Sequence, residues 1–170
     1  MENALLPNCG NQVSAEDNFC SKCGFKLKGV ELFTPEQRAV MDVILKRVEA
    51  IRNRDPKTIE ELVDKALYTK FDDWPPFTRL EGEFALNEAA KALKVLVRYE
   101  YEVSGWRIDI LGDVAVASFY IAYRGRIRRL DFDIRSRVST VLIKRDGVWR
   151  IVHEHFSRIG EKERRAFFAF

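Results

Sequence analysis

The sequence predicts an α+β domain in which helices come first and antiparallel strands follow, with a short cysteine-bearing appendage in front. Three observations support this prediction. Residues 34–67 and 87–97 carry apolar side chains at helical spacing, residues 101–158 alternate polar and apolar side chains between turn signals, and all three cysteines lie within the first 23 residues. Helices followed by consecutive strands are typical of α+β folds, in which the helices pack on the sheet.

Length and charge limit what the chain can be. Its 170 residues suffice for one domain of ordinary size plus a small appendage. No apolar run approaches the roughly 20 residues that a membrane helix needs, and no charged-then-apolar leader is present, so we expect a cytoplasmic protein with no membrane partner. The formal net charge is only +3, and the excess of Arg and Lys after Arg124 falls short of a nucleic-acid-binding footprint.

The first 27 residues are rich in turn formers and have almost no apolar periodicity, so they cannot fold on hydrophobic burial alone. A metal knuckle is indicated by Cys20-Ser21-Lys22-Cys23-Gly24, because two thiolates at this spacing can grip one tetrahedral zinc ion. A second knuckle is indicated by Pro7-Asn8-Cys9-Gly10. Three clustered cysteines without an export signal favour a metal site over a disulfide framework.

Residues 5–27 resemble the short zinc-ribbon family, down to the Phe before the third cysteine position and the Gly after each knuckle. The family pattern has its first cysteine three residues before Cys9, where this chain has Leu6. The resemblance therefore implies a structural zinc site made by Cys9, Cys20 and Cys23, with a fourth ligand from another side chain, water or a neighbouring chain. The alternative is a degenerate ribbon that holds no metal. We infer no organic cofactor.

Three helices are predicted after a short connector. The first starts at Thr34, which can form a capping box with Gln37, and its apolar stripe continues to about residue 53. A second helix occupies about a dozen residues after Asp55-Pro56, and a third begins at Asn87. Such helices lie naturally across a sheet.

Residues 71–84, between the second and third helices, lose all periodicity. The stretch Trp74-Pro75-Pro76-Phe77 cannot be helical, because each proline restricts the residue before it. One interpretation is an aromatic plug that closes the open end of the core. The other is the lip of a ligand pocket. The predicted pocket residues are Trp74, Phe77, Tyr120 and Arg137.

Four long strands are predicted at residues 101–111, 114–123, about 126–145 and 148–158, with turns at Gly112-Asp113, Gly125 and Asp146-Gly147. Strands of this length twist strongly, so the sheet is expected to wrap around the helices. On the last strand, strict alternation places Trp149, Ile151, His153 and His155 on one face, and Arg150, Val152, Glu154 and Phe156 on the other.

From about Thr34 to Arg158 the chain resembles the SnoaL-like branch of the nuclear transport factor 2-like superfamily. The strongest match is the last hairpin, Lys-Arg-Asp-Gly-x-Trp-Arg-Ile-Val-His-x-His-x-Ser at Lys144 to Ser157, and Arg137 also fits that branch. The resemblance implies a cone of curved sheet around a long helix. We therefore divide the chain into a zinc-ribbon-like segment (1–28), a linker (29–33), the cone (34–159) and a tail (160–170).

The last hairpin is also similar to the association domain of calcium/calmodulin-dependent protein kinase II, which implies a role in oligomerisation. Two arginine positions of that domain's pocket are Thr140 and Phe156 in this chain. The pocket Asp base and the Tyr and Asp donors of ketosteroid isomerases have no counterparts that we can assign. Superfamily membership therefore leaves enzymes, binders and scaffolds open.

The candidates for catalysis are His153, His155 and Glu154. The two imidazoles could bind a metal or move a proton near neutral pH, whereas the alternative role is structural, in hydrogen bonds of the hairpin. The basic turn formed by Arg124, Arg126, Arg128 and Arg129 is interpreted as solubilising.

The sequence predicts a ligand-binding or oligomerisation module, homodimeric through its sheet, with a pocket for a small apolar ligand and a ribbon for protein contact or regulation. It does not establish an enzyme. The alternatives are an isomerase, dehydratase or cyclase that uses a His or Glu in the pocket, and a regulator that contacts nucleic acid through its ribbon. In the tail, Phe167, Phe168 and Phe170 are expected to dock on the sheet or on a second chain.

Overall fold

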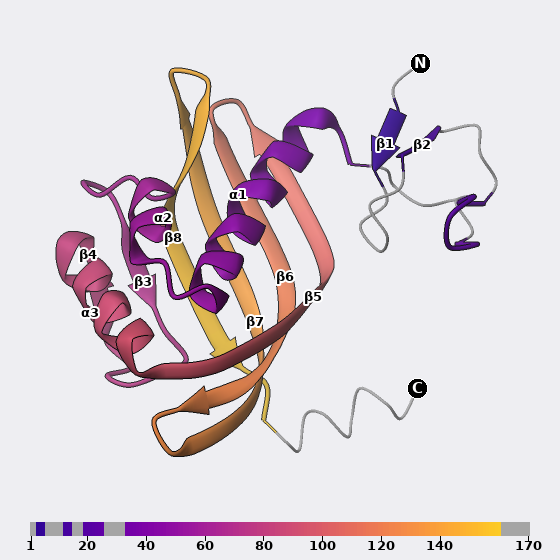
Figure 1. Cartoon of the computed structure of the whole chain (residues 1–170). Helices are drawn as coiled ribbons and strands as arrows, with labels where there is room; N and C mark the ends of the chain where they lie inside the picture. The colour runs from indigo at the N-terminus through magenta and orange to yellow at the C-terminus, as the bar shows by residue number, and fades with distance from the viewer. Residues whose placement is uncertain (1–2, 6–11, 15–18, 26–32, 161–170) are drawn as a thin grey trace. The chain divides into compact units, whose positions relative to one another are not determined.

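A curved six-stranded sheet dominates the computed structural model of the chain, which describes residues 3–5, 12–14, 19–25 and 33–160 (Figure 1). The chain divides into two units, residues 1–39 and residues 40–170. The predicted α+β architecture is confirmed. Leu6, Cys9 and the tail phenylalanines lie outside the described residues. No helix among the described residues is long and apolar enough to cross a membrane.

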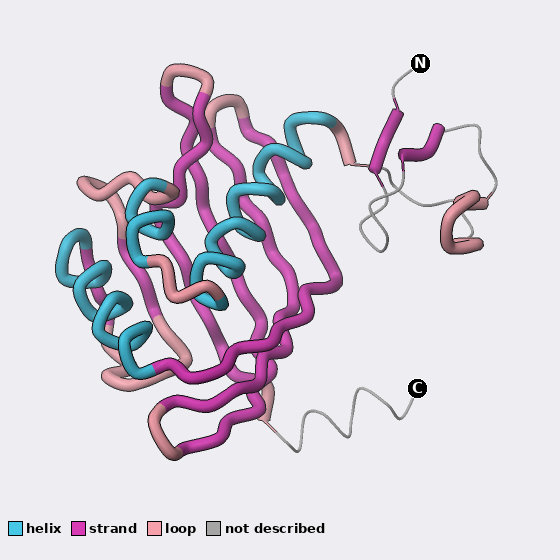
Figure 2. Tube along the Cα trace, viewed as in Figure 1, coloured by secondary structure: helices cyan, strands magenta, loops and turns pink. Residues whose placement is uncertain are grey.

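In the helix-and-sheet unit two short strands lie between the second and third helices, which the sequence did not predict (Figure 2). In chain order they are α1 (Pro35–Arg52), α2 (Pro56–Glu61), β3 (Thr69–Phe71), β4 (Arg79–Glu81), α3 (Gly82–Val95), β5 (Leu96–Leu111), β6 (Val114–Ile127), β7 (Leu130–Arg145) and β8 (Val148–Arg158). The strand order is β4-β3-β8-β7-β6-β5. All neighbours are antiparallel except β3 and β8, which run parallel, so the sheet is mixed and not purely antiparallel as predicted.

The first helix forms where the sequence predicts it. The Thr34 amide donates to Gln37 Oε1 at 2.8 Å and the Gln37 amide donates to Thr34 Oγ1 at 3.2 Å, which is the reciprocal capping box. From Val40 onward the helix lies across the concave face of the sheet (Figure 1). Its buried side chains there are Val40, Met41, Ile44, Arg47, Val48 and Ala50.

The second and third helices differ from the prediction. The second ends at Glu61, because the backbone after it bonds to the edge of β8: the Ile151 amide donates to Leu62 O and the Asp64 amide to Ile151 O, both at 2.9 Å. Tertiary hydrogen bonds override helical periodicity here. The third helix begins at Gly82, earlier than predicted, since the preceding residues form the short strands β3 and β4.

The structure confirms one predicted turn and corrects another. Asp146 and Gly147 both have positive φ, as predicted for this hairpin. The predicted turn at Gly125 is wrong, because the chain reverses at Arg128 and Gly125 lies inside β6. A Cβ on Gly125 would lie 2.0 Å from Arg98 O, so glycine is required there for the close approach of β5.

A β-bulge on β8 changes which side chains face the cone interior. Val141 pairs with His153 and Leu142 with Ile151, so Val152 has no partner on β7. The extra residue reverses the alternation beyond it. The predicted faces are therefore wrong after Ile151. Trp149 and Ile151 share the concave face with Glu154 and Phe156, while His153 and His155 lie on the convex face.

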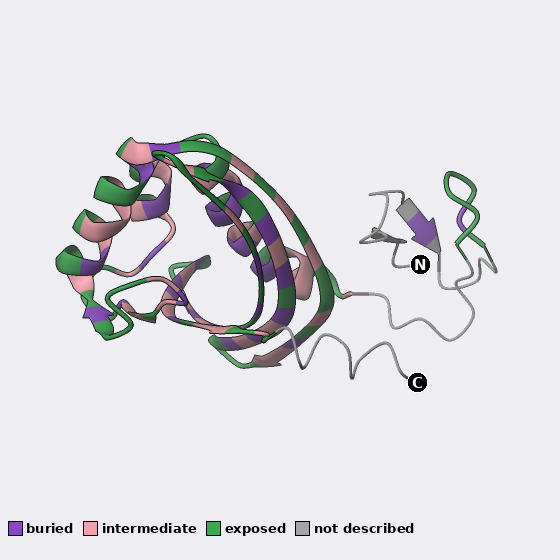
Figure 3. Ribbon diagram, turned by 90° about the horizontal axis from the view of Figure 1, so that it is seen from below, coloured by how far each residue is buried: buried purple, intermediate pink, exposed green. Residues whose placement is uncertain are grey.

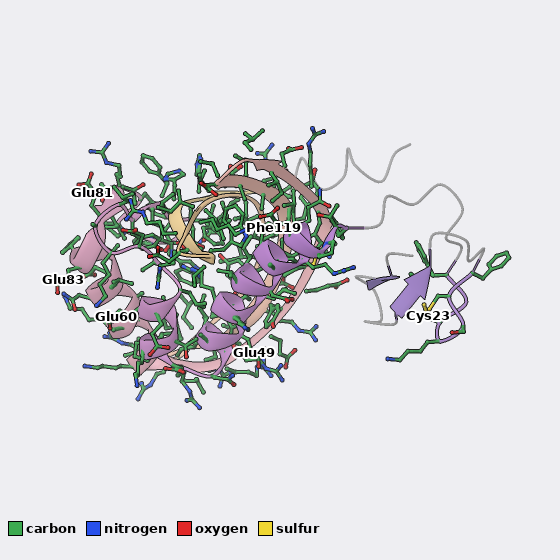
Figure 4. The ribbon with its side chains drawn as sticks, turned by 90° about the horizontal axis from the view of Figure 1, so that it is seen from above. Cys23, Glu49, Glu60, Glu81, Glu83 and Phe119 are labelled. Carbon is green, nitrogen blue, oxygen red and sulfur yellow. The ribbon has the colours of Figure 1, made fainter. Side chains whose placement is uncertain are left out.

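The core lies between the helices and the concave face, where buried positions alternate along β6 and β7 (Figure 3). Phe119, labelled in Figure 4, is one of these positions and packs 4.5 Å from the Trp106 ring, centroid to centroid. The helices described within residues 40–160 lie on the concave side, so none of them covers the convex face (Figure 1).

The N-terminal unit contains a small antiparallel pair, β1 (Asn3–Leu5) with β2 (Gln12–Ser14), and a tight turn at the cysteine knuckle. In that turn the Gly24 amide donates to Cys20 O at 2.9 Å and Gly24 has φ +71°. The backbone of Cys20–Gly24 thus turns back on itself in the way a knuckle requires.

Candidate functional site

The deepest polar group inside the cone is an ion pair between α1 and β8. Arg47 Nε lies 2.7 Å from Glu154 Oε2, and both side chains are 2% exposed. The Nε hydrogen is not directed at any acceptor among the described residues, so the attraction at this nitrogen is one of charge. The Tyr68 hydroxyl donates to the same Glu154 oxygen at 2.6 Å. Three elements therefore meet at one carboxylate.

Burial and charge decide the ionisation of this cluster. Burial is the largest single influence on Arg47 and lowers its pKa, but the charge of Glu154, the contacts with Tyr68 and the charge of Asp72 together outweigh burial and raise that pKa above its ordinary value. Burial, followed by the charge of Glu154, raises the pKa of Tyr68, so the phenol stays neutral. Within this cluster Arg47 therefore keeps its positive charge and Tyr68 keeps its proton at neutral pH.

A second group of polar side chains lies nearer the open end, in the segment that follows β3. The Tyr123 hydroxyl donates to Asp73 Oδ2 at 2.7 Å, and the Ser136 hydroxyl donates to the same oxygen. Asp73 is 4% exposed, whereas its neighbour Asp72 reaches the surface and pairs with Lys70 at 2.5 Å. Two adjacent carboxyl groups thus have very different surroundings.

The pKa values of Asp72 and Asp73 are shifted in opposite directions. Burial is the largest influence on Asp73, and with the charge of Asp72 it raises the pKa of Asp73 above its ordinary value despite the hydrogen bonds from Ser136 and Tyr123. Burial is the largest single influence on Asp72 and raises its pKa, but the charge and hydrogen bond of Lys70, the hydrogen bond with Asp73 and the charge of Arg47 together lower that pKa below its ordinary value. Such a division suits one group to donate a proton and the other to remain ionised.

Aromatic rings surround Asp73. Tyr99 stacks on Tyr123 with centroids 5.6 Å apart, and Trp74 meets Phe132 edge-on at 5.3 Å. The Tyr99 hydroxyl has no hydrogen-bond partner among the residues that the structure describes, and the charges that act on it are those of Arg47, Asp73 and Asp72. We call Asp72, Asp73, Trp74, Tyr99, Tyr123, Phe132 and Ser136 the mouth cluster.

The structure separates the predicted site residues. Glu154 lies inside the cone, but His153 and His155 lie on the convex face, where Phe71 contacts both imidazole rings. His153 Nδ1 is 2.7 Å from Thr69 Oγ1. The histidines therefore do not converge with Glu154.

The predicted pocket residues are separated too. Trp74 belongs to the mouth cluster, whereas Phe77 has a positive φ of 56° and is 64% exposed. Tyr120 and Arg137 are cross-strand neighbours on the convex face, and the Tyr120 ring covers Gly105. These four side chains do not line one pocket.

The convex face has its own groove, of about 330 Å³, over β5, β6 and β7. Its walls include carboxylates and guanidinium groups, with Glu100 paired to Arg124 at 2.8 Å. Towards the middle of β6 the outward side chains become small or apolar, as at Val116, Ser118 and Ala122.

The described part of the chain contains no group of three or more His, Cys, Asp or Glu side chains that could hold a metal ion. Two members of the predicted zinc set, Cys20 and Cys23, are described: Cys20 is buried, and Cys23, labelled in Figure 4, is exposed. The third, Cys9, lies outside the described residues. Thiolates in a knuckle turn are the donors that zinc prefers, so the two described residues fit the ion.

Sequence reasoning missed Arg47 and Asp73. The signal for Arg47 is a charged residue in the middle of the apolar stripe of α1, between Ile44 and Val48. The Arg47 guanidinium lies 5.9 Å from the centroid of the Phe156 ring, so it reaches the last strand from α1. Asp73 gave a weaker signal, an acidic pair just before an aromatic, proline-rich stretch.

Comparison with known proteins agrees with this architecture. The family profile of SnoaL-like domains matches residues 40–160, and that of zinc-ribbon domains matches residues 7–27. No curated protein matches the chain.

Solved structures share the fold at low sequence identity. A proposed dehydratase of the nuclear transport factor 2-like family from Streptomyces avermitilis has a TM-score of 0.67 at 15% identity, covering 75% of this chain and 99% of that chain. A nuclear transport factor 2-like superfamily protein from Salmonella enterica has a TM-score of 0.64 at 20% identity, covering 74% and 92%. A proposed scytalone dehydratase from Novosphingobium aromaticivorans has a TM-score of 0.65 at 15% identity, covering 74% and 85%.

Proposed function

This chain belongs to the SnoaL-like domain family, and on that premise we propose that its cone binds a small, uncharged molecule at the mouth cluster. Two features of the mouth cluster carry the proposal. Asp73 is buried and its pKa is raised, and the Tyr99 hydroxyl has no hydrogen-bond partner among the described residues. The Tyr99 hydroxyl can donate a hydrogen bond, and so can a protonated Asp73 carboxyl group, which also shares a hydrogen bond with Asp72. Molecules with a carbonyl oxygen supply the matching acceptor.

Charge and shape support an uncharged ligand. Apart from Asp73, the interior has two ion pairs, Arg47 with Glu154 and Lys70 with Asp72. The charges of these pairs cancel, so a charged ligand would add a charge that no group there compensates. Trp74, Phe132 and Tyr123 offer ring faces and edges to an apolar body. An aromatic or alicyclic ketone combines both features.

The same residues favour a second candidate function, an enzyme that moves protons during dehydration or isomerisation. The specific observation is the adjacent pair Asp72 and Asp73, whose pKa values are shifted in opposite directions. In this candidate Asp73 is the acid, and His153 and His155 take no part because they lie on the other face of the sheet.

The Tyr99 hydroxyl gives the sharpest test of ligand binding. We expect thermal-shift screening of small aromatic ketones to identify binders, and isothermal titration to show that Tyr99→Phe weakens the best one about tenfold, the loss of one hydrogen bond. The matched control is Tyr101→Phe, because the Tyr101 hydroxyl bonds Glu49 outside the mouth cluster. Equal losses in both variants, or no binder in the screen, would reject the proposal.

We also propose that the protein is a homodimer through the convex face. Support comes from the absence of any covering helix there within residues 40–160, and from the small or apolar side chains at the centre of β6. The central Tyr120 is 41% exposed, which leaves a large ring available for a partner. The groove on the convex face has both acidic and basic side chains, so a two-fold axis can place the acids of one chain opposite the arginines of the other.

Sedimentation velocity at micromolar protein tests the homodimer. We expect a dimer for the natural chain and a monomer for Tyr120→Glu, because a carboxylate at the centre of a closed interface must lose its hydration. Phe84→Glu is the control, since Phe84 is exposed on α3, away from the sheet face. A monomeric natural chain, or a Tyr120→Glu variant that remains dimeric, contradicts the proposal.

For the N-terminal unit we propose that Cys20 and Cys23, together with Cys9, hold a structural zinc ion. The knuckle turn at Gly24 supports this assignment. Protein purified without added metal should contain about one equivalent of zinc per chain by plasma mass spectrometry, and Cys20→Ser should lower that content well below one equivalent. Zinc well under one equivalent in the natural chain would mean that the ribbon is degenerate.

A further inference from the structure

A cationic surface lies where the β6–β7 turn meets the junction between α3 and β5 (Figure 1). The Arg128 amide donates to Val95 O at 2.9 Å, and Arg54 Nη1 donates to Leu96 O at 3.3 Å, so the turn and the end of α1 both attach to this junction. Arg98 and Arg126 are direct cross-strand partners next to it. We call the following exposed residues the junction patch: Arg54, Lys94, Arg98, Arg126, Arg128 and Arg129.

The charges of the junction patch are poorly compensated. Among the described residues only Arg126 has a carboxylate partner, Asp131, through two hydrogen bonds of 2.8 Å. The charge of Arg98 also acts on Glu100, which pairs with Arg124. With this pair and the neighbouring Asp55 counted, seven cations face three carboxylates, a local net charge of +4. The whole chain has a net charge of only +3, so the positive charge of the protein is concentrated here.

The fold places like charges together at a cost. Two arginines directly opposite each other on antiparallel strands repel, and Asp131 is shared between them because the charges of both Arg126 and Arg98 act on it. Arg128 holds a positive φ of 53°, which an arginine adopts at a steric cost. A bound polyanion would relieve the repulsion that the free protein retains.

We propose that the junction patch binds the phosphate backbone of a nucleic acid without reading its sequence. The cations come from three separate parts of the chain and form an open surface, which suits an extended polyanion better than a single phosphate. Five of the six are arginines, whose guanidinium groups can bind phosphate oxygens in pairs. The only large apolar side chains exposed beside the patch in the described chain are Val97 and Leu130, little area for membrane insertion.

This inference goes beyond ligand binding in the cone and places nucleic-acid contact on the cone surface, away from the ribbon. The basic turn that the sequence suggested was solubilising becomes part of a larger patch, because the fold adds Arg54, Lys94 and Arg98 to it. Those three residues are distant from the turn in sequence, so the patch exists only in the folded chain.

The test is fluorescence anisotropy of a labelled 20-nucleotide single strand and its duplex with the full-length protein at 20 to 200 mM KCl. We expect affinity to fall steeply with salt, with a slope near the number of phosphates contacted, and equally for unrelated sequences. The variant Lys94→Gln/Arg98→Gln/Arg129→Gln should bind at least tenfold more weakly at 50 mM KCl and with a salt slope smaller by about 2 to 3.

A charge-matched control removes three other exposed arginines: Arg79→Gln/Arg107→Gln/Arg145→Gln. Equal weakening in this control would show that net charge alone attracts the nucleic acid, and it would overturn the proposal. So would no binding at 20 mM KCl, or tighter binding to vesicles with 30% phosphatidylserine than to nucleic acid. Circular dichroism checks the fold, and Arg98→Gln/Arg129→Gln replaces the triple variant if that variant is unfolded.

Discussion

The buried pair of Arg47 and Glu154 is the constraint on which the rest of the cone depends. It joins the helix on the concave face to the last strand, and Tyr68 adds the segment before β3 to the same oxygen. A charge so deeply buried is tolerated only with its partner, and removing one member of such a pair costs roughly 3 to 5 kcal/mol. The bulge at Val152 is what turns Glu154 inward, so a single unpaired backbone residue makes the pair possible.

Once this pair is in place, the charge balance of the interior determines the chemistry of the mouth. Lys70 and Asp72 form a second pair, which leaves Asp73 as the remaining buried acid. A third negative charge would be uncompensated, so burial favours the neutral carboxyl group. The raised pKa of Asp73, together with a Tyr99 phenol that has no hydrogen-bond partner among the described residues, is the feature that supports ligand binding in our proposal.

The local signals in the sequence were sufficient for the helix start at Thr34 and the hairpin at Asp146-Gly147, because side-chain capping and positive φ act over a few residues. They were insufficient for features set by distant partners. The bulge leaves the alternating pattern of β8 unbroken in the sequence, so His153 and His155 were grouped with Ile151 although they face the other way. Arg47 and Asp73 acquire their roles only when strands far along the chain enclose them.

The account depends on a raised pKa of Asp73, and an NMR titration of its carboxyl carbon, assigned with Asp73→Asn, measures this pKa most directly. Because the folded pKa is raised, the neutral form stabilises the fold at low pH, and this contribution is lost as pH rises through the folded pKa. We predict that Asp73 titrates above the ordinary value of 3.8 and that Asp72 titrates below it. An Asp73 that titrates at or below 3.8 would contradict the account, because the mouth would then contain a carboxylate and no neutral donor.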